Sequence, residues 1–590
     1  MNIKSSYIKN LFWSIKEIKR FNRNHLILLC INSIAEGILP VLLLATTQNM
    51  INKLQQGSRY WTEAFIWLSV VMSIGLFEDI LGSFLNLKLE VYEKNFEIYI
   101  QKKIFSKISK LKCRDFEKSY VHDMVNRTQY DSNASILENA KIFFSVISLM
   151  LSILSYTVIL GRYSKLTTII LFVLPCIRFL YEKKYNLEEY NFTKKRTNDM
   201  RKTAYLSSLL TDAEYFKELK IFNLFKTLIE EYRNIKKRYV KKLLDLKKKR
   251  TIVYTVINSG SVLIEFGVLL RIISKVLRGD ILIGKFIMLN GAINNLNQNI
   301  ISFLSRVSFL YRNAVIIEDL KCFFSMEEES NIDDGIVIEK INKIEFKNVS
   351  YRYAVETDYV LKDINITLRR GCRYILIGEN GAGKTTLSKI ILGLYDDYEG
   401  TVYINGIDMK SINILEYRKK VSVLFQDYIK FETTIDNNIC YGKIYNKENN
   451  VTSSEILEQV DLLTLEPIMN VQLGNQFLGG RQLSIGQWQR VALGRAIAKD
   501  ADIYLLDEPN ASLDVISENK VITSIFKRDD SKIKILICHR FYRFANIADE
   551  LLFLSEGTII ARGNHSHMLS MCPKYKELYD LQQAMGKEKE

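Results

Sequence analysis

The stretch that decides the fold of the second half of this chain reads Gly378-Glu379-Asn380-Gly381-Ala382-Gly383-Lys384-Thr385-Thr386. It follows the apolar run 374–377 and matches the Walker A pattern G-x-x-x-x-G-K-[ST] in its required context of strand, glycine-rich loop and helix. The glycines let the backbone curl until its N–H groups point at phosphate oxygens, and the helix that begins near Lys384 adds its positive end. We expect this loop to bind a nucleoside triphosphate, with Lys384 on the β- and γ-phosphates and Thr385 on Mg²⁺.

Length and composition limit the remaining possibilities. A chain of 590 residues is too long for one hydrophobic core, so two to four domains are expected. The 48% hydrophobic content argues against a disordered chain. The net charge of +16 could indicate nucleic acid, but the basic runs flank apolar segments as in cytoplasmic loops of membrane proteins, so we expect no nucleic-acid partner. The eight cysteines are scattered and predict reduced thiols without a metal cluster.

The first half of the chain contains six apolar stretches of membrane-spanning length, about 20 residues each. They lie at 26–48, 63–86, 141–160, 165–183, 252–275 and 284–309. Long charged loops follow the second and fourth stretches, and their lysines and arginines place these loops and both termini in the cytoplasm. From residue 344 onward strands alternate with helical patterns. We therefore predict a helical six-span membrane domain at 1–325, a linker at 326–343 and an α/β nucleotide-binding domain at 344–590.

Two further patterns follow the Walker A loop. The run 501–508 predicts a buried strand that ends in two carboxylates, a Walker B pattern, with Asp507 placed to hold Mg²⁺ and Glu508 to orient or deprotonate the attacking water. The run Leu483-Ser484-Ile485-Gly486-Gln487 precedes a helix and resembles the LSGGQ signature of ATP-binding cassette (ABC) proteins. That signature matters because a phosphate loop alone would also fit kinases, GTPases and helicases.

The resemblance to ABC proteins extends to single residues. Tyr353 resembles the A-loop aromatic that stacks on adenine, and Gln426 resembles the Q-loop glutamine that senses Mg²⁺. Asp514, in the run 511–514, lies in a stretch similar to the D-loop, and His539 resembles the switch histidine on the γ-phosphate. The resemblance implies ATP and Mg²⁺ as cofactors, with Glu508, His539 and Gln426 in catalytic roles. It also implies Thr385, Gln426 and Asp507 as the residues around the metal.

Nearly the whole chain resembles ABC exporters. This implies two cytoplasmic coupling helices, near 114–130 and 211–228, and a dimer in which each ATP lies between one Walker loop and the partner's signature. The signature residues for that contact are Ser484, Gly486 and Gln487. The partner is either a second copy of this chain or an unlike half-transporter. The chain departs from the family pattern at Ile485, where a glycine is usual, at Ala511, where serine is common, and at 478–482, where a glutamate is missing.

The substrate is less well defined by the sequence. A tryptophan directly after the signature, Trp488, resembles exporters of lanthipeptides and other bacteriocins, so a peptide or small amphipathic substrate is favoured over the multidrug or lipid cargo of related exporters. Acids in the predicted spans either line a pathway for cationic peptides or make structural bonds between helices; they are Glu36, Glu78, Asp79 and Glu265. The resemblance places the protein in the bacterial cytoplasmic membrane.

Two readings from other classes compete with a transporter. A soluble ABC protein that acts on ribosomes or DNA needs no membrane spans, and the six apolar stretches argue against it. A receptor-like regulator would bind ATP without turning it over, and Glu508 is the residue that tests this reading.

Overall fold

The chain folds into two units in a computed structural model, which describes residues 3–194, 197–213, 215–329, 335–354, 356–444, 451–509, 522–523, 525–526, 530–538 and 540–587. The first unit comprises Met1–Ile108 and Tyr120–Met326, and the second comprises Ser109–Ser119 and Glu327–Glu590. The short segment 109–119 therefore belongs to the second unit, although the residues on either side of it belong to the first.

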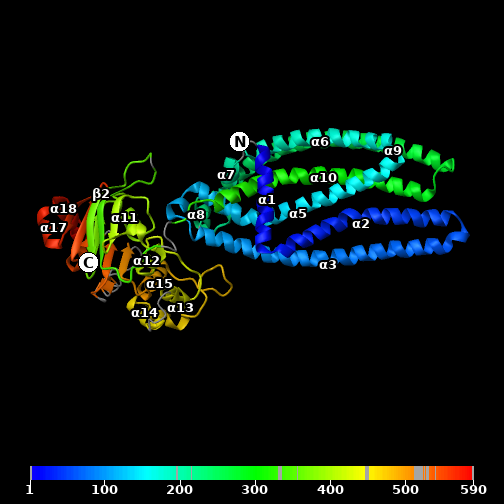
Figure 1. Ribbon diagram of the computed structural model, residues 1–590. Coiled ribbons are helices and arrows are strands. Elements are labelled where there is room, and N and C mark those ends of the chain that lie inside the picture. Colours follow the sequence, from blue (N-terminus) through cyan, green and yellow to red (C-terminus); the bar gives the residue numbers. More distant parts are fainter. Residues whose placement is uncertain are drawn as a thin grey trace. The chain divides into compact units, whose positions relative to one another are not determined.

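The first unit is a bundle of long helices (Figure 1). Its helices are α1 (Ile3–Phe21), α2 (Arg23–Gln55), α3 (Trp61–Ile108), α5 (Ser119–Tyr163), α6 (Lys165–Lys194), α7 (Thr197–Thr211), α8 (Phe216–Ile221), α9 (Phe225–Leu277) and α10 (Ile283–Phe324). The helices α2 and α3 pack as a hairpin, while α10 packs against α2, α6 and α9. Leu289, Ile293 and Leu296 of α10 belong to a buried apolar cluster with Tyr156 and Ile272.

Among the described residues, four helical segments are long and apolar enough to cross a membrane: Arg23–Gln55, Ser58–Ile108, Ser135–Tyr163 and Phe225–Leu277. They contain the first, second, third and fifth predicted stretches. The other two stretches also lie in long helices, 165–183 in α6 and 284–309 in α10, but these do not reach the same apolar character. Polar groups interrupt both, since α6 carries Arg178 and Glu182 and α10 carries Asn294, Asn295 and Asn297.

Charged side chains pack inside this unit where helices meet. Glu17 of α1 is almost fully buried and accepts hydrogen bonds from Arg20 at 2.7 Å and from Lys103 of α3 at 2.5 Å. Glu182 of α6 pairs with Arg250 of α9 at 2.8 Å. A charge this deep needs a partner, because an uncompensated buried charge is strongly destabilising. These pairs therefore fix how α1, α3, α6 and α9 pack.

The second unit contains two sheets. An antiparallel sheet has the order β2-β1-β4-β5, with β1 (Lys343–Tyr351), β2 (Leu361–Arg369), β4 (Glu399–Ile404) and β5 (Ile407–Asp408). The second sheet has the order β10-β9-β3-β8-β7-β6, with β3 (Arg373–Gly378), β6 (Val421–Leu424), β7 (Ile503–Asp507), β8 (Ile533–Ile537), β9 (Glu550–Ser555) and β10 (Thr558–Gly563). Its strands from β9 to β6 pair in parallel, and only β10 is antiparallel.

The parallel strands are buried on both faces, and β8 is buried at every residue. The helices of this unit are α4 (Cys113–Phe116), α11 (Lys384–Ile391), α12 (Ile414–Lys419), α13 (Ile435–Lys443), α14 (Ser453–Gln459), α15 (Ile485–Ala498), α17 (His565–Met571) and α18 (Pro573–Lys587). Ligands of such open α/β sheets bind beyond the carboxyl ends of the strands. The Walker A loop follows β3, Gln426 follows β6 and Glu508 follows β7, so the fold brings three predicted site segments to one edge.

Candidate nucleotide site

The Walker A loop joins β3 to α11 in the conformation that its glycines predict. Gly381 and Gly383 adopt φ values of +80° and +103°, which favour glycine, and Gly383 caps the N-terminus of α11. A Cβ on Gly378 would lie 2.3 Å from the backbone oxygen of Leu554, and one on Gly383 would lie 2.8 Å from the side chain of Leu361. The close packing of the loop against β9 and β2 therefore requires glycine at both positions.

Lys384 reaches back over this loop. Its Nζ donates to the backbone oxygens of Gly378 at 2.7 Å and Glu379 at 2.9 Å. Burial lowers the pKa of the Lys384 ammonium, while the carboxylates of Glu508 and Asp507 act in the opposite direction. The ammonium thus lies inside the loop with two carboxylates in its electrostatic environment.

Two carboxylates lie at the end of the Walker B strand as expected. Asp507 is the last residue of β7 and is 5% exposed. Glu508 has a φ of +49°, a strained value for this residue type, and strained backbone concentrates at functional sites. Its backbone N–H donates to Ile537 at 2.9 Å, and the buried Gln489 of α15 donates to its carbonyl oxygen at 3.2 Å. These bonds hold Glu508 in the strained conformation.

Gln426 and Glu508 meet at the sheet edge. The Gln426 amide Nε2 donates to Glu508 Oε2 at 2.9 Å, so residues 82 apart in sequence are in direct contact. The parallel pairing of β6 with β7 brings them together, because Leu424 lies beside Leu506 in register. The sequence predicted roles for both residues but not this bond. Gln489 was not predicted at all, although its position two residues after the signature was a usable signal.

Tyr353 lies beside the start of α11. Its hydroxyl is 2.9 Å from Thr386 Oγ1, and its ring is 41% exposed. The ring packs edge-on against Tyr351 and Tyr395, with centroid distances of 5.4 and 6.1 Å. The structure therefore brings the predicted adenine-stacking residue to the helix that begins at the phosphate loop.

The signature residues form the first turn of α15. Ser484 is the N-cap: its Oγ accepts from the Gln487 N–H at 3.2 Å, and Gln487 Oε1 accepts from the Ser484 N–H at 2.9 Å, which completes a capping box. Ile485 replaces the usual glycine without a positive φ, and its side chain is 64% exposed. The isoleucine is thus compatible with the backbone. Trp488 is buried in the core of this unit, where it packs rather than contacts a ligand.

Three sequence predictions lie outside the described residues: Ala511 and Asp514 of the D-loop stretch, and His539 of the switch. Arg540, which follows His539, is described, and so is β8, which ends at Ile537.

The residues present fit ATP and Mg²⁺. The Walker A loop curls through glycines with positive φ, and the Lys384 ammonium lies against its backbone oxygens, as a phosphate-binding loop requires. Oxygen ligands suit Mg²⁺, and Thr385, Asp507 and Gln426 supply a hydroxyl, a carboxylate and an amide oxygen. Asp507 is buried beside a cationic lysine, where a divalent cation would stabilise its charge.

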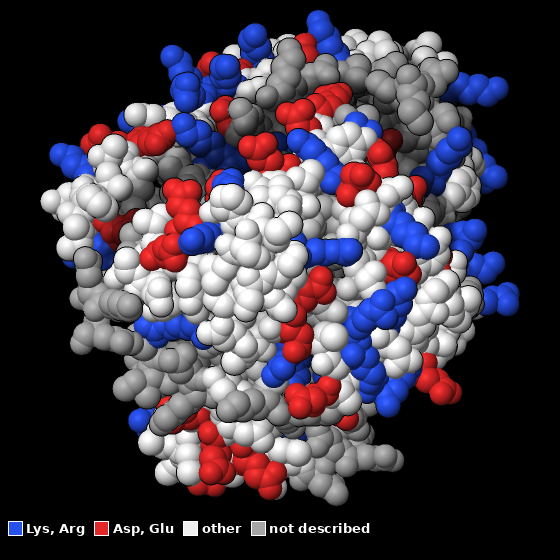
Figure 2. Space-filling view, turned by 90° about the vertical axis from the view of Figure 1, so that its left-hand side faces the viewer, with Lys and Arg blue, Asp and Glu red and all other residues white. Residues whose placement is uncertain are grey.

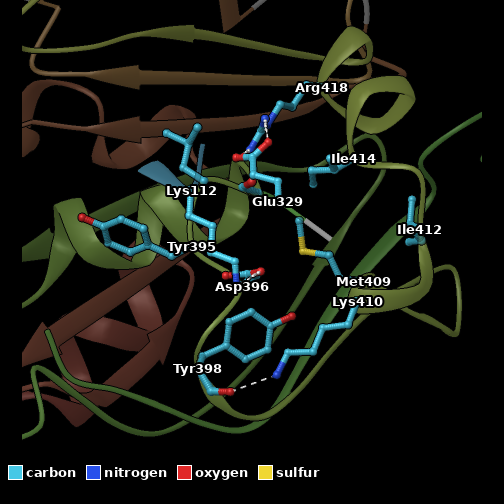
Figure 3. A pocket seen from close by; sticks show the side chains of 12 residues that line it. Lys112, Glu329, Tyr395, Asp396, Tyr398, Met409, Lys410, Ile412, Ile414 and Arg418 are labelled. Atoms are coloured by element: carbon cyan, nitrogen blue, oxygen red, sulfur yellow. Dashed lines mark hydrogen bonds and ion pairs between the residues drawn. The ribbon is translucent and has the colours of Figure 1, made fainter. Parts of the chain in front are cut away.

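A second feature of this unit is a pocket between segment 109–119, the residues after Met326 and the nucleotide-binding core (Figure 3). Glu329 and Arg418 form a bidentate pair with both distances at 2.8 Å, and the Arg418 guanidinium also donates to the backbone oxygen of Gly393 at 2.5 Å. The Glu329 N–H donates to Lys110 at 2.8 Å, and Lys112 lies 3.5 Å from Asp396. The two segments by which the chain enters this unit, at 109–119 and after Met326, therefore lie side by side.

Charge on the face shown in Figure 2 is mixed. Lysine and arginine side chains alternate with aspartate and glutamate over that face. Nucleic-acid-binding faces instead gather cations in one patch or stripe. The net positive charge is therefore not gathered in one place on this face.

Comparison with known proteins gives the same class. Residues 361–511 match the family model described as ABC transporter. The chain is 29% identical over 559 residues to the subtilin transport ATP-binding protein of Bacillus subtilis. This alignment covers 94% of the present chain and 91% of the Bacillus protein. It is 27% identical over 573 residues to the nisin transport ATP-binding protein of Lactococcus lactis subsp. lactis, covering 96% and 95%.

A lipid transporter is also similar. The chain is 24% identical to the ATP-dependent lipid A-core flippase of Wigglesworthia glossinidia brevipalpis over 82% of this chain and 83% of that one. Among solved structures, that of a bacterial Atm1-family ABC exporter with ATP bound superposes with a TM-score of 0.74 at 19% identity, covering 95% of this chain and 98% of that chain. The helical membrane domain followed by an α/β nucleotide-binding domain is thereby confirmed as the fold.

Proposed function

We propose that this chain, an ATP-hydrolysing ABC exporter of the cell membrane, exports a ribosomally made peptide of the lanthipeptide or bacteriocin type. The observation that carries the peptide assignment is the likeness along almost the whole chain to transport proteins named for subtilin and nisin. A likeness confined to the nucleotide-binding domain would say nothing of cargo. Here it extends through the helical unit, which is where a transported molecule must pass.

ATP hydrolysis is assigned to the carboxyl edge of the parallel sheet. Lys384 and the loop N–H groups hold the phosphates, and Tyr353 stacks on the base. Thr385, Asp507 and Gln426 would hold Mg²⁺, which would neutralise charge on the phosphates. Glu508 orients or deprotonates the attacking water, and Gln426 holds its carboxylate at 2.9 Å. His539 and Asp514 take the switch and D-loop roles that the resemblance implies.

The working form is a dimer, which we assign to two copies of this chain. One chain carries one Walker loop and one signature, so Ser484, Gly486 and Gln487 of a second subunit complete each site. The proposed domain limits are 1–325 for the membrane domain, 326–343 for the linker and 344–590 for the nucleotide-binding domain. An unlike half-transporter as partner would show as an ATPase that is inactive until a second gene product is added.

The acidic residues of the helical unit bear on whether the exported peptide is cationic, and two of them also have hydrogen-bond partners within the unit. Asn297 of α10 donates to Glu265 of α9 at 2.5 Å, so this carboxylate has a structural partner. Glu36 accepts from Asn32 on its own helix at 2.8 Å. Acids at membrane depth usually face a bundle interior or a watery cavity. We assign them to the pathway, where these amides hold the carboxylates in place.

Reconstitution in liposomes tests the proposal. The purified chain is expected to hydrolyse ATP, with stimulation by cationic precursor peptides and not by lipid A or cationic dyes. The Glu508→Gln variant should bind ATP yet lose about 10²–10⁴-fold in turnover, the usual contribution of a positioned base. Stimulation by lipid A alone would favour the flippase reading, which the 24% identity over 82% of the chain also supports. A wild-type chain that shows no turnover with these peptides, either alone or with an unlike half-transporter added, would refute transport and favour a regulator.

A further inference from the structure

Segment 109–119 joins α3 to α5, yet it folds with the nucleotide-binding unit and touches the A-loop residue directly. Arg114 Nη2 donates to the backbone oxygen of Tyr353 at 2.8 Å across 239 residues of sequence. The same guanidinium forms an ion pair with Asp397. A charge-assisted bond to a carbonyl is stronger than a neutral one, so Arg114 restrains the backbone from which the Tyr353 ring projects.

A second side chain of this segment reaches the helix of the phosphate loop. Glu117 Oε1 accepts from Lys389 Nζ at 2.7 Å, and Glu117 Oε2 accepts from the Tyr395 hydroxyl at 2.8 Å. Lys389 lies on α11, five residues after Lys384, and it also donates to the Tyr395 hydroxyl at 3.0 Å. Glu117 therefore holds α11 itself and the tyrosine that packs on it.

The two contacts converge on Tyr353. Its backbone is held by Arg114, one side of its ring packs edge-on against Tyr395 at 89°, and its hydroxyl bonds Thr386 on α11. Segment 109–119 thus supports both the orientation of the Tyr353 ring and the position of α11. In the proposed ATP site, Tyr353 would contact the base, whereas α11 would contact the phosphates.

We propose that Arg114 and Glu117 are positioning residues for the nucleotide site: Arg114 sets the base-stacking ring of Tyr353, and Glu117 sets α11 and with it the phosphate loop. The segment between α3 and α5 then controls base recognition and phosphate binding through separate side chains. The inference rests on the proposed function, because it requires Tyr353 to stack on the adenine of ATP.

The test compares two ligands on the full-length chain in lipid nanodiscs without Mg²⁺, so that no turnover occurs. Arg114→Ala is expected to weaken ATP binding about tenfold, within the range of losing one base–aromatic stack. It should leave the affinity for inorganic tripolyphosphate, which has no base, unchanged. Asp397→Asn, which loosens Arg114 without touching Tyr353, should weaken ATP binding in the same direction by less. Glu117→Gln should weaken the binding of both ligands.

Lys118→Ala is the matched control, since Lys118 is in the same segment and pairs locally with Asp115 at 2.6 Å. It should change neither affinity. Combining Arg114→Ala with Tyr353→Ala separates the stacking role of Tyr353 from the positioning role of Arg114. No further loss in the double variant supports positioning. If Arg114→Ala weakens the affinity for ATP and for tripolyphosphate equally, the positioning role of Arg114 is refuted while the stacking role of Tyr353 stands. The same conclusion follows if its loss of ATP affinity adds fully to that of Tyr353→Ala. Full ATP affinity in Tyr353→Ala refutes the stacking role, and the positioning role of Arg114 with it.

Discussion

The pair Glu329–Arg418 offers a quantitative test of how the residues after Met326 are fixed to the nucleotide-binding unit. At an effective dielectric constant of about 20, two charges about 4 Å apart attract by about 4 kcal/mol before desolvation is subtracted. The side chains are 11% and 26% exposed, between the buried pairs that cost about 3–5 kcal/mol to break and the exposed pairs that contribute below about 1 kcal/mol. We therefore expect Glu329→Gln to destabilise this unit by about 2 kcal/mol.

A double-mutant cycle with Arg418→Met isolates the pairwise energy. Scanning calorimetry of the full-length chain at a fixed scan rate should show a fall of about 4–8 °C in the transition of this unit for Glu329→Gln. The double variant should be more stable than the sum of the single losses predicts, by about 2 kcal/mol. Glu416→Gln, which breaks the neighbouring exposed pair with Lys419, is the control and should cost less than about 0.5 kcal/mol. Single effects that add within about 0.5 kcal/mol would refute the coupling.

Three further changes probe packing, pH dependence and the membrane. Gly442→Ala should destabilise by about 1–3 kcal/mol in calorimetry, because its Cβ would lie 2.2 Å from a backbone oxygen of α15; stabilisation, as helix propensity alone predicts, would contradict this. Arg373 donates hydrogen bonds to the Asp549 carboxylate at 2.8 and 2.9 Å, and these bonds lower the pKa of that carboxyl. The pair therefore stabilises the fold above the unfolded pKa of about 3.9, and this stabilisation is lost as the pH falls through the folded pKa. Asp549→Asn should thus cost below about 1 kcal/mol at pH 7, since the pair is partly exposed, and nothing near pH 2; an equal cost at both pH values would count against it. Glu265→Gln keeps the hydrogen bond with Asn297, so stability should change by less than about 0.6 kcal/mol while export of a cationic peptide falls; unchanged export would exclude a charged lining.

The sequence predicted the helices better than their ends. The stretch 63–86 lies inside α3, which continues to Ile108, and 252–275 lies inside α9, which begins at Phe225. Hydropathy falls where a segment leaves the membrane, but the backbone hydrogen bonds of a helix continue into water. For α6 and α10 apolar length alone was not decisive, since polar side chains that bond neighbouring helices lower their hydropathy.

The amino-acid sequence predicts the phosphate loop, the two Walker B carboxylates and the signature, because each depends on residues within a few positions of one another. Backbone curvature, strand ends and helix caps are local properties that spacing reveals. The contacts between distant residues become visible only in the folded chain: Gln426 holds Glu508, Gln489 supports Glu508 from α15, and Arg114 reaches Tyr353 across 239 residues. Those contacts depend on the order of strands in the sheet and on where segment 109–119 packs, and no local spacing in the chain encodes either.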